Sequence, residues 1–579
     1  MPKIEVNEQL FYRLVGRRWP DRDSFEEALT CVKAELDEDS DKSQPEAERI
    51  LKIELNDTNR PDLWSTAGVA RQLRIYGGGR AEYGFFSRPG AIQESVRYRV
   101  MVDAALREIR PYIAAYVVSG KTIDDNGLKD VIQTQEKLCW NFGRKRRSIA
   151  MGIYRTSLIQ WPVRYVAADP ETTKFIPLGM TEKLSLREIC EKHPKGQEYG
   201  YIVSSFKQFP YLTDSVGETL SFPPVINSAR IGAVEVGDSE LFIEMTGTDL
   251  ESLTLAVNMT ACDFADMGYT VHPVTVEYPY DTPFGRTITF PYYFQKPTFC
   301  SLKRVEKFLG ETLSGRDCVV ALERMGCRAE LTEDAEAGST EKKPGLRVYP
   351  SEYRNDFLHA ADVVEDVMIG RSLPSFKPVT PRDFTIGRLT PITQFSRKVK
   401  ELMIGLGYQE MIYNYLGSGK DFVEKMCRDG SRIIRISNPM TENYEYVRDS
   451  VLASLMISES VSAHAVFPHK IFEVGKVAYR DDAENYGVIT HQHLGFVHAA
   501  SDANFNIAAS QLQALFYYLS REYEVVEVED SRFIPGRVAG IFYKGNQIGV
   551  VGELHPQVLE NWGVVMPCTA CEVDLDALL

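Results

Sequence analysis

The sequence has no long apolar run, no dense set of cysteines and no excess of positive charge. No apolar stretch approaches the roughly 20 residues that a helix needs to cross a bilayer. Residues 1–7 carry an acid where a signal peptide has an apolar segment. Ten cysteines among 579 residues lack the even spacing of a secreted disulfide scaffold. These absences predict a protein of the reducing cytoplasm without a membrane partner.

The shortage of positive charge also narrows the class of nucleic-acid partner. A net charge of -15 argues against non-specific coating of nucleic acid, which needs clustered Lys and Arg. One basic run stands out, GRKRR at residues 143–147. Such a run is most often a solvated face, and a local contact with RNA is the alternative.

The length predicts several domains. A chain of 579 residues exceeds what one hydrophobic core supports, and roughly 150 residues per domain suggests about four. No internal repeat of the kind that marks solenoids is visible. Breaks in the pattern predict an α+β multi-domain protein. The N-terminal α+β domain is expected at 1–92, a second domain at 93–276 and a linker at 277–297. A small helix-turn-helix-like domain is expected at 298–376, and an α+β domain with an antiparallel sheet at 380–579.

Local patterns predict particular elements. The linker assignment rests on the prolines and tyrosines of residues 278–297, which favour extended chain. The polar tract 330–344 is interpreted as a mobile loop or a hairpin tip. Helices are expected at 250–267, with Thr248 or Asp249 as the cap, at two short glycine-ended segments within 301–326, and at 395–406. Strands are expected at 201–203, 241–243, 432–436, 470–474, 540–543 and 548–551.

A cluster of carboxylates is the sharpest chemical feature. Asp362, Glu365 and Asp366 stand at i, i+3 and i+4, so one helix face would carry all three. Hard oxygen ligands at this spacing suit Mg²⁺. Asp356 lies too far back for that face and has to fold in from a loop, cap the helix or serve a second ion. A solvated acidic helix face remains the alternative.

The segment around these acids carries a family resemblance. RNDFLHAADVVEDVMIGR, residues 354–371, is very similar to the metal-binding segment of phenylalanyl-tRNA synthetase β subunits. The resemblance implies that Asp356, Asp362, Glu365 and Asp366 bind magnesium, partly shared with an α subunit. Further resembling segments follow in family order at residues 54–74, 135–155, 210–249 and at several places after 436.

Two of these segments concern the N-terminal half. Residues 54–74 resemble the family's N-R-P-D and G-V-A-R signature and are read as a turn and an amphipathic helix that serve fold and interface. Residues 135–155 resemble the entrance of the family's editing domain, with a departure at Arg155. The basic run at 143–147 then becomes a predicted contact for the acceptor end of tRNA.

The stretch 210–249 resembles the editing pocket that hydrolyses tyrosine wrongly attached to the phenylalanine tRNA. A pocket shaped for Phe discriminates only ~10²-fold against one extra hydroxyl, so a second hydrolytic site is useful. By resemblance, Leu212, Ser221, Glu244 and Thr246 are the pocket residues, although the family has an aspartate where Glu244 stands. Glu244 would accept the substrate hydroxyl, and Ser221 and Thr246 would position it or the attacking water. Alternatively, residues 244–249 are a strand end that leads to a capped helix.

The region after residue 380 resembles the β subunit's class II synthetase-like core. A working class II site needs an arginine and an acid to hold ATP, and no convincing pair of this kind is found near Arg448 or Arg537. The region is predicted to be a core lacking the active-site motifs. Two weaker patterns, Cys568–Cys571 and His491–His493, are interpreted as a lone CxxC and a polar surface pair rather than as metal sites.

The resemblance as a whole implies a subunit of phenylalanine–tRNA ligase. Its short archaeal and eukaryotic type is expected, because the extra tRNA-binding and anticodon-binding domains of the bacterial type have no counterpart here. The implied partners are tRNA(Phe) and an α subunit that binds ATP and phenylalanine, in an assembly of two α and two β subunits that releases AMP and diphosphate. A stand-alone tRNA-editing hydrolase and a non-catalytic RNA-binding scaffold are the alternatives.

Overall fold

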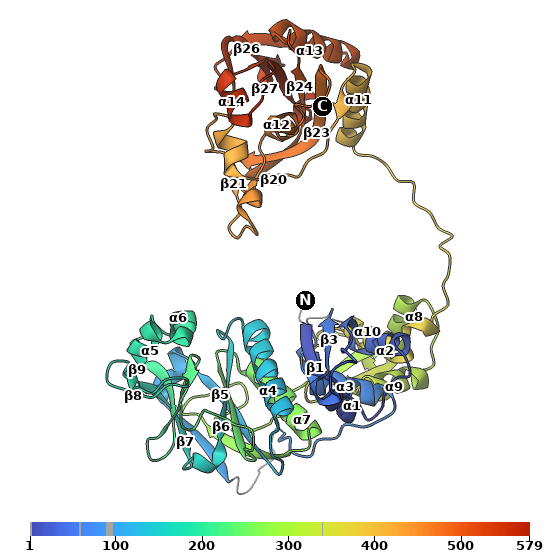
Figure 1. The fold of residues 1–579 in the computed structure, drawn as a ribbon. Coiled ribbons are helices and arrows are strands. Elements are labelled where there is room, and N and C mark those ends of the chain that lie inside the picture. Colours follow the sequence, from blue (N-terminus) through green and yellow to red (C-terminus); the bar gives the residue numbers. More distant parts are fainter. Residues whose placement is uncertain (1–2, 57–58, 89–96, 339) are drawn as a thin grey trace. The chain divides into compact units, whose positions relative to one another are not determined.

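The computed structural model describes residues 3–56, 59–88, 97–338 and 340–579. The chain forms two compact units, Met1–Val379 and Thr380–Leu579, and each is described by itself (Figure 1). The predicted boundary between residues 92 and 93 lies outside the described residues. No helix in the part of the chain that the structure describes is long and apolar enough to cross a membrane.

The first unit begins with a small α+β domain. Its three antiparallel strands are β1 (Lys3–Asn7), β3 (Ile50–Leu55) and β2 (Ala34–Glu38), in that order across the sheet. Its helices are α1 (Glu8–Val15), α2 (Arg22–Leu29) and α3 (Thr66–Tyr76). Alternate residues of β1 and β3 are buried, as expected where one face of a sheet packs against helices. The predicted turn and helix of residues 54–74 are present as a 3₁₀ turn at Pro61–Leu63 and α3, apart from residues 57–58, which are not described.

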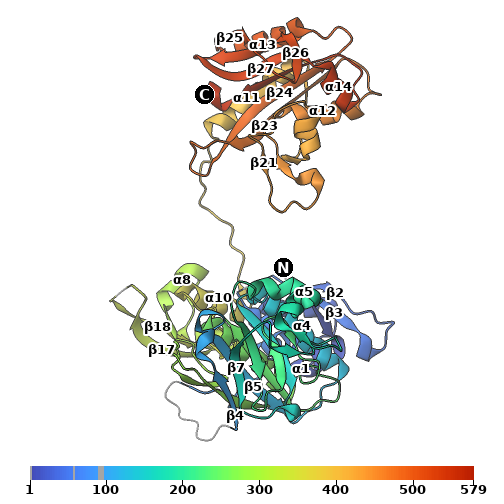
Figure 2. The same cartoon turned by 90° about the vertical axis from the view of Figure 1, so that its left-hand side faces the viewer.

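A ten-stranded mixed sheet forms the centre of the next domain (Figure 2). Nine strands run in the order β12 (Ile226–Asn227), β11 (Thr219–Phe222), β10 (Phe209–Thr213), β7 (Val163–Ala168), β4 (Tyr98–Val102), β14 (Thr270–Glu277), β5 (Tyr112–Ser119), β13 (Leu241–Gly247) and β6 (Ile149–Arg155), and β15 (Thr287–Phe290) also pairs with β14. A short hairpin joins β8 (Lys174–Phe175) and β9 (Leu184–Ser185). The helices are α4 (Asp125–Lys137), α5 (Leu186–Lys192), α6 (Pro194–Tyr199) and α7 (Leu250–Asp266).

Several local predictions can be compared with this domain. The strand at 241–243 is confirmed within β13, and the helix at 250–267 is confirmed as α7. The Asp249 side chain accepts a hydrogen bond from the Ser252 amide at 2.8 Å, so Asp249 is the cap. The strand predicted at 201–203 is wrong, because α6 runs directly into a 3₁₀ turn at Gly200–Ile202.

Residues 277–297 are a packed part of this domain, and their interpretation as a linker is wrong. β15 pairs with β14 over four residues, and Phe290 is fully buried. The hydroxyl of Tyr278 donates to the carbonyl of Ile113, and that of Tyr280 donates to the carbonyl of Pro111. The prolines and tyrosines do favour extended chain, but here the extended chain adds a strand and buries its rings.

The last part of the first unit packs three helices on a three-stranded sheet. The helices are α8 (Leu302–Leu309), α9 (Gly315–Arg324) and α10 (Ala360–Arg371), and the sheet order is β16 (Thr298–Ser301), β18 (Lys342–Tyr349) and β17 (Arg328–Ala335). Gly310 ends α8 in the left-handed region at φ 71°, as the sequence predicts. Of the two interpretations of tract 330–344, the hairpin holds, since β17 and β18 pair from Arg328 with Tyr349 to Ala335 with Lys342.

Arg71 on α3 connects all three parts of this unit. Its guanidinium donates to Asp263 at 3.1 Å and to Asp266 at 2.9 Å, both on α7. The same guanidinium lies 4.2 Å from the centre of the Tyr353 ring, which precedes α10. All four side chains belong to one buried network, so the helices α3 and α7 are joined by charge as well as by packing.

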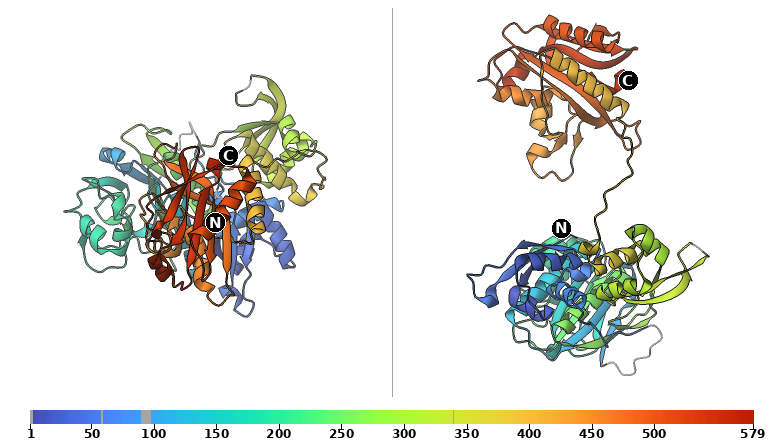
Figure 3. Two further views of the ribbon diagram at one scale, coloured as in Figure 1. Left: turned by 90° about the horizontal axis from the view of Figure 1, so that it is seen from above. Right: turned by 90° about the vertical axis from the view of Figure 1, so that its right-hand side faces the viewer.

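The second unit is built on a seven-stranded sheet (Figure 3). The order is β19 (Gln409–Glu410), β23 (His469–Arg480), β24 (Val488–Ala499), β28 (Cys568–Asp574), β27 (Asn546–Leu554), β26 (Phe533–Tyr543) and β25 (Glu524–Glu527), antiparallel except for β19 with β23. A second, three-stranded sheet contains β20 (Leu416–Gly417), β22 (Tyr446–Val447) and β21 (Ile434–Arg435). The helices are α11 (Pro391–Gly405), α12 (Leu452–Val461), α13 (Phe505–Leu519) and α14 (Pro556–Trp562). The strands predicted at 470–474, 540–543 and 548–551 lie within β23, β26 and β27, while the strand predicted at 432–436 and the helix predicted at 395–406 overlap β21 and α11.

Candidate functional site

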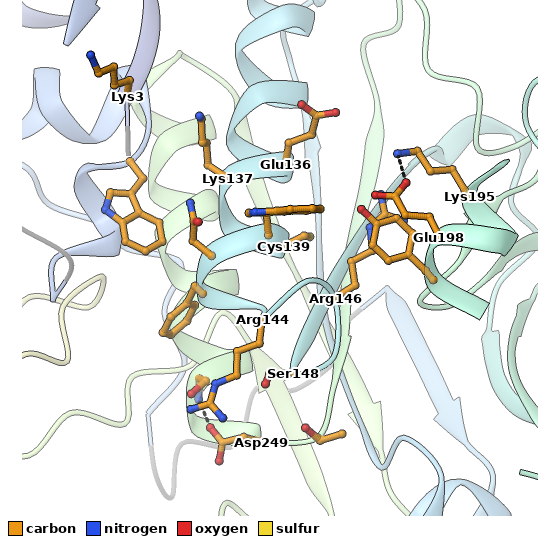
Figure 4. Close-up of a pocket in the computed structure, with 17 residues that line it drawn as sticks. Lys3, Glu136, Lys137, Cys139, Arg144, Arg146, Ser148, Lys195, Glu198 and Asp249 are labelled. Atoms are coloured by element: carbon orange, nitrogen blue, oxygen red, sulfur yellow. Dashed lines mark hydrogen bonds and ion pairs between the residues drawn. The ribbon is translucent and has the colours of Figure 1, made fainter. Parts of the chain in front are cut away.

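Two adjoining cavities in the first unit are lined by several of the residues predicted to act on tRNA. The larger has a volume of about 1410 Å³ and is drawn in Figure 4. The smaller has a volume of about 330 Å³. Arg146 and Lys195 line both cavities, so the two spaces meet at these side chains.

The smaller cavity is an apolar pocket that contains one carboxylate. Its lining includes apolar side chains of α4, β6, β11 and β13 and of the segments just before α4 and just after β11, namely Ile123, Leu128, Val131, Met151, Ile153, Phe222, Val225 and Leu241. Ser221 and Glu244 also line it. An apolar space of this size with few polar groups is typical of a site for a small organic group.

Glu244 lies on β13 at the inner end of this pocket. The hydroxyl of Tyr154 lies 2.7 Å from Glu244 Oε1 and 2.8 Å from the hydroxyl oxygen of Ser221. Glu244 Oε2 is buried and has no hydrogen-bond partner. A buried carboxylate oxygen without a partner is costly, by about 1–3 kcal/mol or more, unless a ligand satisfies it.

The apolar surroundings of the pocket also change the pKa of the Glu244 carboxyl. Burial raises the pKa of the Glu244 carboxyl to about 7, while the hydrogen bond from Tyr154 and the charge of Arg110 act in the opposite direction. Gly152, the β6 residue paired with Glu244, has no room for a side chain, because a Cβ there would overlap the Tyr154 hydroxyl and Glu244 Oε1. The strand pair is therefore shaped around the carboxyl and the phenol.

Thr246 and Leu212 do not line either cavity. Thr246 is two residues beyond Glu244 on β13, and its hydroxyl accepts from Arg110 Nε at 2.9 Å. Leu212 lies on β10 opposite Ser221 and is fully buried. The structure thus brings Ser221 and Glu244 together at the pocket and places the other two predicted residues in the surrounding frame.

Sequence reasoning missed Tyr154 and Arg110. Tyr154 follows Gly152 by two residues on the same strand, so period-two alternation places both on one sheet face. That signal was visible in segment 135–155 once the strand was recognised. Arg110 gave no signal, because its partner Thr246 is 136 residues away.

The basic run forms an unusual turn at the larger cavity. α4 continues into a π turn at Leu138–Phe142, and then Arg144, Lys145 and Arg146 have φ values of 49°, 54° and 65°. Consecutive left-handed residues other than glycine cost energy and persist where the surroundings impose them. Here the amides of Lys145 and Arg146 donate to carbonyls of the π turn, both at 2.9 Å.

Aromatic rings accompany these cations. Lys145 Nζ lies 4.9 Å from the centre of the Trp140 ring, and the Arg147 guanidinium lies 5.2 Å from that of Tyr201. Both rings are about half exposed, at 48% and 47%. Arg146 donates to the carbonyls of Pro224 at 3.2 Å and Val225 at 3.0 Å, both in the lining of the smaller pocket. The turn therefore joins a basic, aromatic surface to the pocket that holds Glu244.

The four acids predicted to bind magnesium divide into two sets. Asp356 and Asp366 are held by the buried guanidinium of Arg354, which donates to Asp366 Oδ2 at 2.6 Å and to Asp356 Oδ2 at 2.5 Å. Burial alone would raise the pKa of the Asp356 carboxyl, but the charge and hydrogen bonds of Arg354 lower it to about 2. Both acids are therefore paired with Arg354, and the Asp356 carboxyl stays ionised at neutral pH.

The other two acids lie nearer the surface of α10. Asp362 accepts from the amides of Leu358 at 2.8 Å and His359 at 2.6 Å and so caps the start of the helix. Glu365 accepts from Lys33 at 2.8 Å across to the N-terminal domain. Within the described residues each of the four carboxylates thus already has a protein partner.

The second unit contains an arginine and acid pair that sequence reasoning missed. Arg448 is fully buried and donates to both carboxylate oxygens of Glu473 at 2.8 Å. The two residues are 25 positions apart, and only the fold of β23 brings them together. The buried pair braces the sheet rather than facing open solvent.

Comparisons with known proteins agree with these observations. A model of the phenylalanyl tRNA synthetase beta chain CLM domain matches residues 373–575, and a model of the tRNA synthetase B5 domain matches residues 298–371. The phenylalanine–tRNA ligase beta subunit of Treponema pallidum is 43% identical over 614 residues, covering 100% of both chains. The chain belongs to the phenylalanine–tRNA ligase β-subunit family.

Other members of this family match equally well or extend the comparison to a solved structure. The beta subunit of Borreliella burgdorferi strain ZS7 is 43% identical over 582 residues, again covering 100% of both chains. An N-terminal fragment of the phenylalanyl-tRNA synthetase beta subunit from Pyrococcus horikoshii is 35% identical, with a TM-score of 0.55, and covers 64% of this chain and 99% of its own. The mixed α+β fold of the first unit is thus that of a β-subunit fragment.

Proposed function

We propose that the chain works as the β subunit of phenylalanine–tRNA ligase. With an α subunit, it takes part in the ATP-dependent attachment of phenylalanine to tRNA(Phe), which forms AMP and diphosphate. Family membership over the full length of the curated relatives supports this assignment. We assign activation of phenylalanine to the α subunit, and the buried Arg448–Glu473 pair supports this, because neither side chain is open to a nucleotide.

The chain's own chemistry is hydrolysis of tyrosine misattached to tRNA(Phe). The observation that carries this proposal is Glu244 Oε2, a buried acceptor without a partner in an apolar pocket. The aromatic ring of tyrosine fits the apolar lining, and its hydroxyl supplies the missing hydrogen bond. Phenylalanine has no hydroxyl and would leave that oxygen unpaired. A site that forms a hydrogen bond with a substrate hydroxyl discriminates strongly against the analogue that lacks it.

The tRNA end reaches the pocket through the larger cavity. Phosphates meet Arg144 and Arg146, and unpaired bases stack on rings such as Trp140. Water attacks the carbonyl carbon of the ester, the bond from that carbon to the ribose oxygen breaks, and the ribose oxygen takes up a proton. The Tyr154 hydroxyl contacts Glu244, and the Ser221 hydroxyl contacts Tyr154, so the carboxyl is held in place. The bound tyrosyl side chain then positions the ester for attack by water.

The test compares Glu244→Gln with Glu251→Gln, an exposed glutamate at the start of α7, in the assembled α and β enzyme. Loss of a hydrogen bond to a charged group is worth about 1.5–3 kcal/mol, so Tyr-tRNA hydrolysis should fall about 10-fold or more. Charging with phenylalanine should be unchanged in both variants.

Each alternative has its own outcome in this test. Hydrolysis that is absent from the wild type would support the non-catalytic scaffold and overturn the editing proposal. Hydrolysis that is unaffected by Glu244→Gln would overturn the assignment of the pocket to Glu244. Full hydrolysis by the β chain without any α subunit would favour the stand-alone hydrolase.

Magnesium is also proposed, with Asp356, Asp362, Glu365 and Asp366 as ligands shared with the α subunit. The fit within this chain is incomplete, because Arg354 and Lys33 already neutralise three of the acids. We therefore assign no reaction step to the ion.

The measurement is the magnesium content of the assembled enzyme by atomic emission. The double variant Asp362→Ala, Glu365→Ala should lose magnesium, whereas Glu330→Ala, Glu333→Ala on β17 should retain it. Equal content in the wild type and the first variant would show that these acids hold no ion.

We propose further that the chain is a β subunit of the short, archaeal and eukaryotic type. The relatives align with this chain from end to end over 582 to 614 residues, which supports a short chain. These relatives are bacterial, so their organisms do not support the archaeal and eukaryotic type. The support comes from the length of the relatives and from the likeness to the archaeal fragment. An assembly of two α and two β subunits in the cytoplasm completes the proposal.

A further inference from the structure

The second unit carries a cluster of histidines and a carboxylate on one face of its large sheet. His491 and His493 are two residues apart on β24, so both side chains point to the same face. Asp574 on the neighbouring strand β28 lies directly opposite His493. One potential ligand atom from each of the three residues lies within 4.8 Å of the others.

Hydrogen bonding alone accounts for only part of this cluster. His491 Nδ1 lies 2.5 Å from Asp574 Oδ2, which is a complete pair. His493 Nδ1 lies 3.0 Å from Glu572 Oε1, but its Nε2 is buried and has no hydrogen-bond partner. Buried polar atoms in native proteins are nearly always satisfied, so this nitrogen calls for a ligand.

The contacts of Glu572 resemble the support that metal-binding histidines receive. Glu572 is fixed by the Ser450 hydroxyl at 2.5 Å and the Val451 amide at 2.9 Å. A carboxylate that accepts from one ring nitrogen leaves the lone pair on the other nitrogen, and such carboxylate–histidine pairs surround most metal-bound histidines. Glu572 therefore orients the His493 ring so that the lone pair of Nε2 is available to a metal ion.

The cluster also opens onto a space with an excess of negative charge. A cavity of about 450 Å³ is lined by His493, Asp574 and Glu572, together with residues of the loops above the sheet. Five carboxylates line it against three arginines, namely Asp429, Asp449, Asp530, Glu572 and Asp574 against Arg428, Arg432 and Arg532. This balance favours a cation over an anion.

We propose that His491, His493 and Asp574 bind a divalent transition-metal ion, Zn²⁺ by preference, in the second unit. Two imidazole nitrogens and one carboxylate suit zinc, whereas magnesium prefers oxygen ligands alone. Three protein ligands leave a further coordination position for water or a substrate oxygen from the cavity. The site is separate from the acids of α10 and does not depend on the editing proposal.

The experiment is equilibrium dialysis of the full-length chain against Zn²⁺, with metal content measured by atomic emission. The wild type should bind one zinc more per chain than His493→Ala or His491→Ala, with affinity lowered at least about 10-fold in each variant. His464→Ala removes an exposed histidine of the same unit and should bind as the wild type does.

A second variant and a spectroscopic readout separate metal binding from folding. His493→Gln keeps an amide that can donate to Glu572 but offers no imidazole nitrogen, so it should fold normally and still lose the zinc. Co²⁺ bound to the wild type should give visible absorption bands that are absent from His493→Gln. Equal zinc content in the wild type and His493→Gln, or no bound zinc in either, would overturn the proposal.

Discussion

Glu244 and Asp356 are both buried carboxyls, and their neighbours move their pKa values in opposite directions. Burial raises the pKa of Glu244 to about 7, because no full positive charge is in hydrogen-bond contact with it. For Asp356, the Arg354 guanidinium outweighs burial and lowers the pKa to about 2. Glu244 can therefore change its proton near neutral pH, while Asp356 stays ionised as half of a structural pair.

If Glu244 accepts the substrate hydroxyl as proposed, its pKa should make Tyr-tRNA hydrolysis depend on pH. A carboxylate accepts the substrate hydroxyl only when it has lost its proton, so Tyr-tRNA hydrolysis should rise from about pH 6 to about pH 8. In Glu244→Gln this rise should disappear. The measurement is single-turnover hydrolysis at each pH, after subtraction of spontaneous ester hydrolysis. A pH profile shared by the wild type and Glu244→Gln would place the titrating group elsewhere.

The raised pKa of Glu244 should lower the stability of the fold as pH rises, which is opposite in direction to its expected effect on hydrolysis. The folded-state pKa of Glu244 lies above the ordinary value of 4.5, so the folded protein binds the proton more tightly than the unfolded chain does. Its contribution to the free energy of unfolding is greatest below pH 4.5 and falls as pH rises toward about 7. The protein thus gives up stability at neutral pH to keep an acceptor in an apolar pocket.

At the scale of elements, the turn after α4 is the feature that joins two sites. Three left-handed residues reverse the chain so that Arg146 reaches the carbonyls of Pro224 and Val225. The neighbouring cations and rings stay at the surface of the larger cavity. The turn therefore links the cations at the larger cavity to the wall of the smaller pocket.

Removal of charge from this turn should weaken tRNA binding. Arg144→Ala with Lys145→Ala should lower affinity for tRNA(Phe) and reduce the dependence of log Kd on log salt by about one to two units, since each lost phosphate contact releases fewer counterions. Lys303→Ala with Lys307→Ala on α8 is the matched control and should leave both quantities unchanged. Filter binding between about 50 and 200 mM salt measures the slope. An unchanged slope in the first variant would show that the turn does not contact phosphate.

The elements also show what could be predicted from the sequence. Helices with a cap and an apolar period, such as α7 and α11, were found because the signal is local. The strand β15 was missed, because its proline-rich flanks resemble a linker until β14 is there to pair with it. Ser221 and Glu244 were identified by resemblance, while Tyr154 needed the strand pairing and Arg110 needed the fold. The pairing of Arg354 with Asp356 and Asp366 could not be predicted from the sequence. Such a pairing matters because all three side chains are buried, and the fold alone determines their burial.

At the scale of the whole molecule, the chain is two units joined by an exposed segment. Residues 377–390 have no helix or strand and are exposed along their length. Each unit has its own hydrophobic core, one around the sheet of β5 and β13 and one around the sheet of β24 and β28. Each core is therefore expected to unfold as a unit of its own.

Limited proteolysis of the isolated chain should reveal this division. Trypsin should cut first at Arg382 or Arg388, because the exposed segment can enter a protease site without unfolding a core. Mass spectrometry should find one fragment that ends at residue 382 or 388 and one that starts at residue 383 or 389. The variant Arg382→Gln, Arg388→Gln should be cut more slowly by a large factor. First cleavage within either unit would contradict the division.

The Arg71 network limits how the domain that holds the Glu244 pocket can be transplanted. A graft that began after α3 would carry Asp263 and Asp266 away from their arginine, leaving two buried carboxylates unmatched. Loss of one partner from a buried ion pair costs about 3–5 kcal/mol, which is a large part of a domain's stability. A protein engineer would have to move α3 with the domain or replace both acids by neutral residues. The same constraint applies to recombination, so we expect the first two domains to be inherited together.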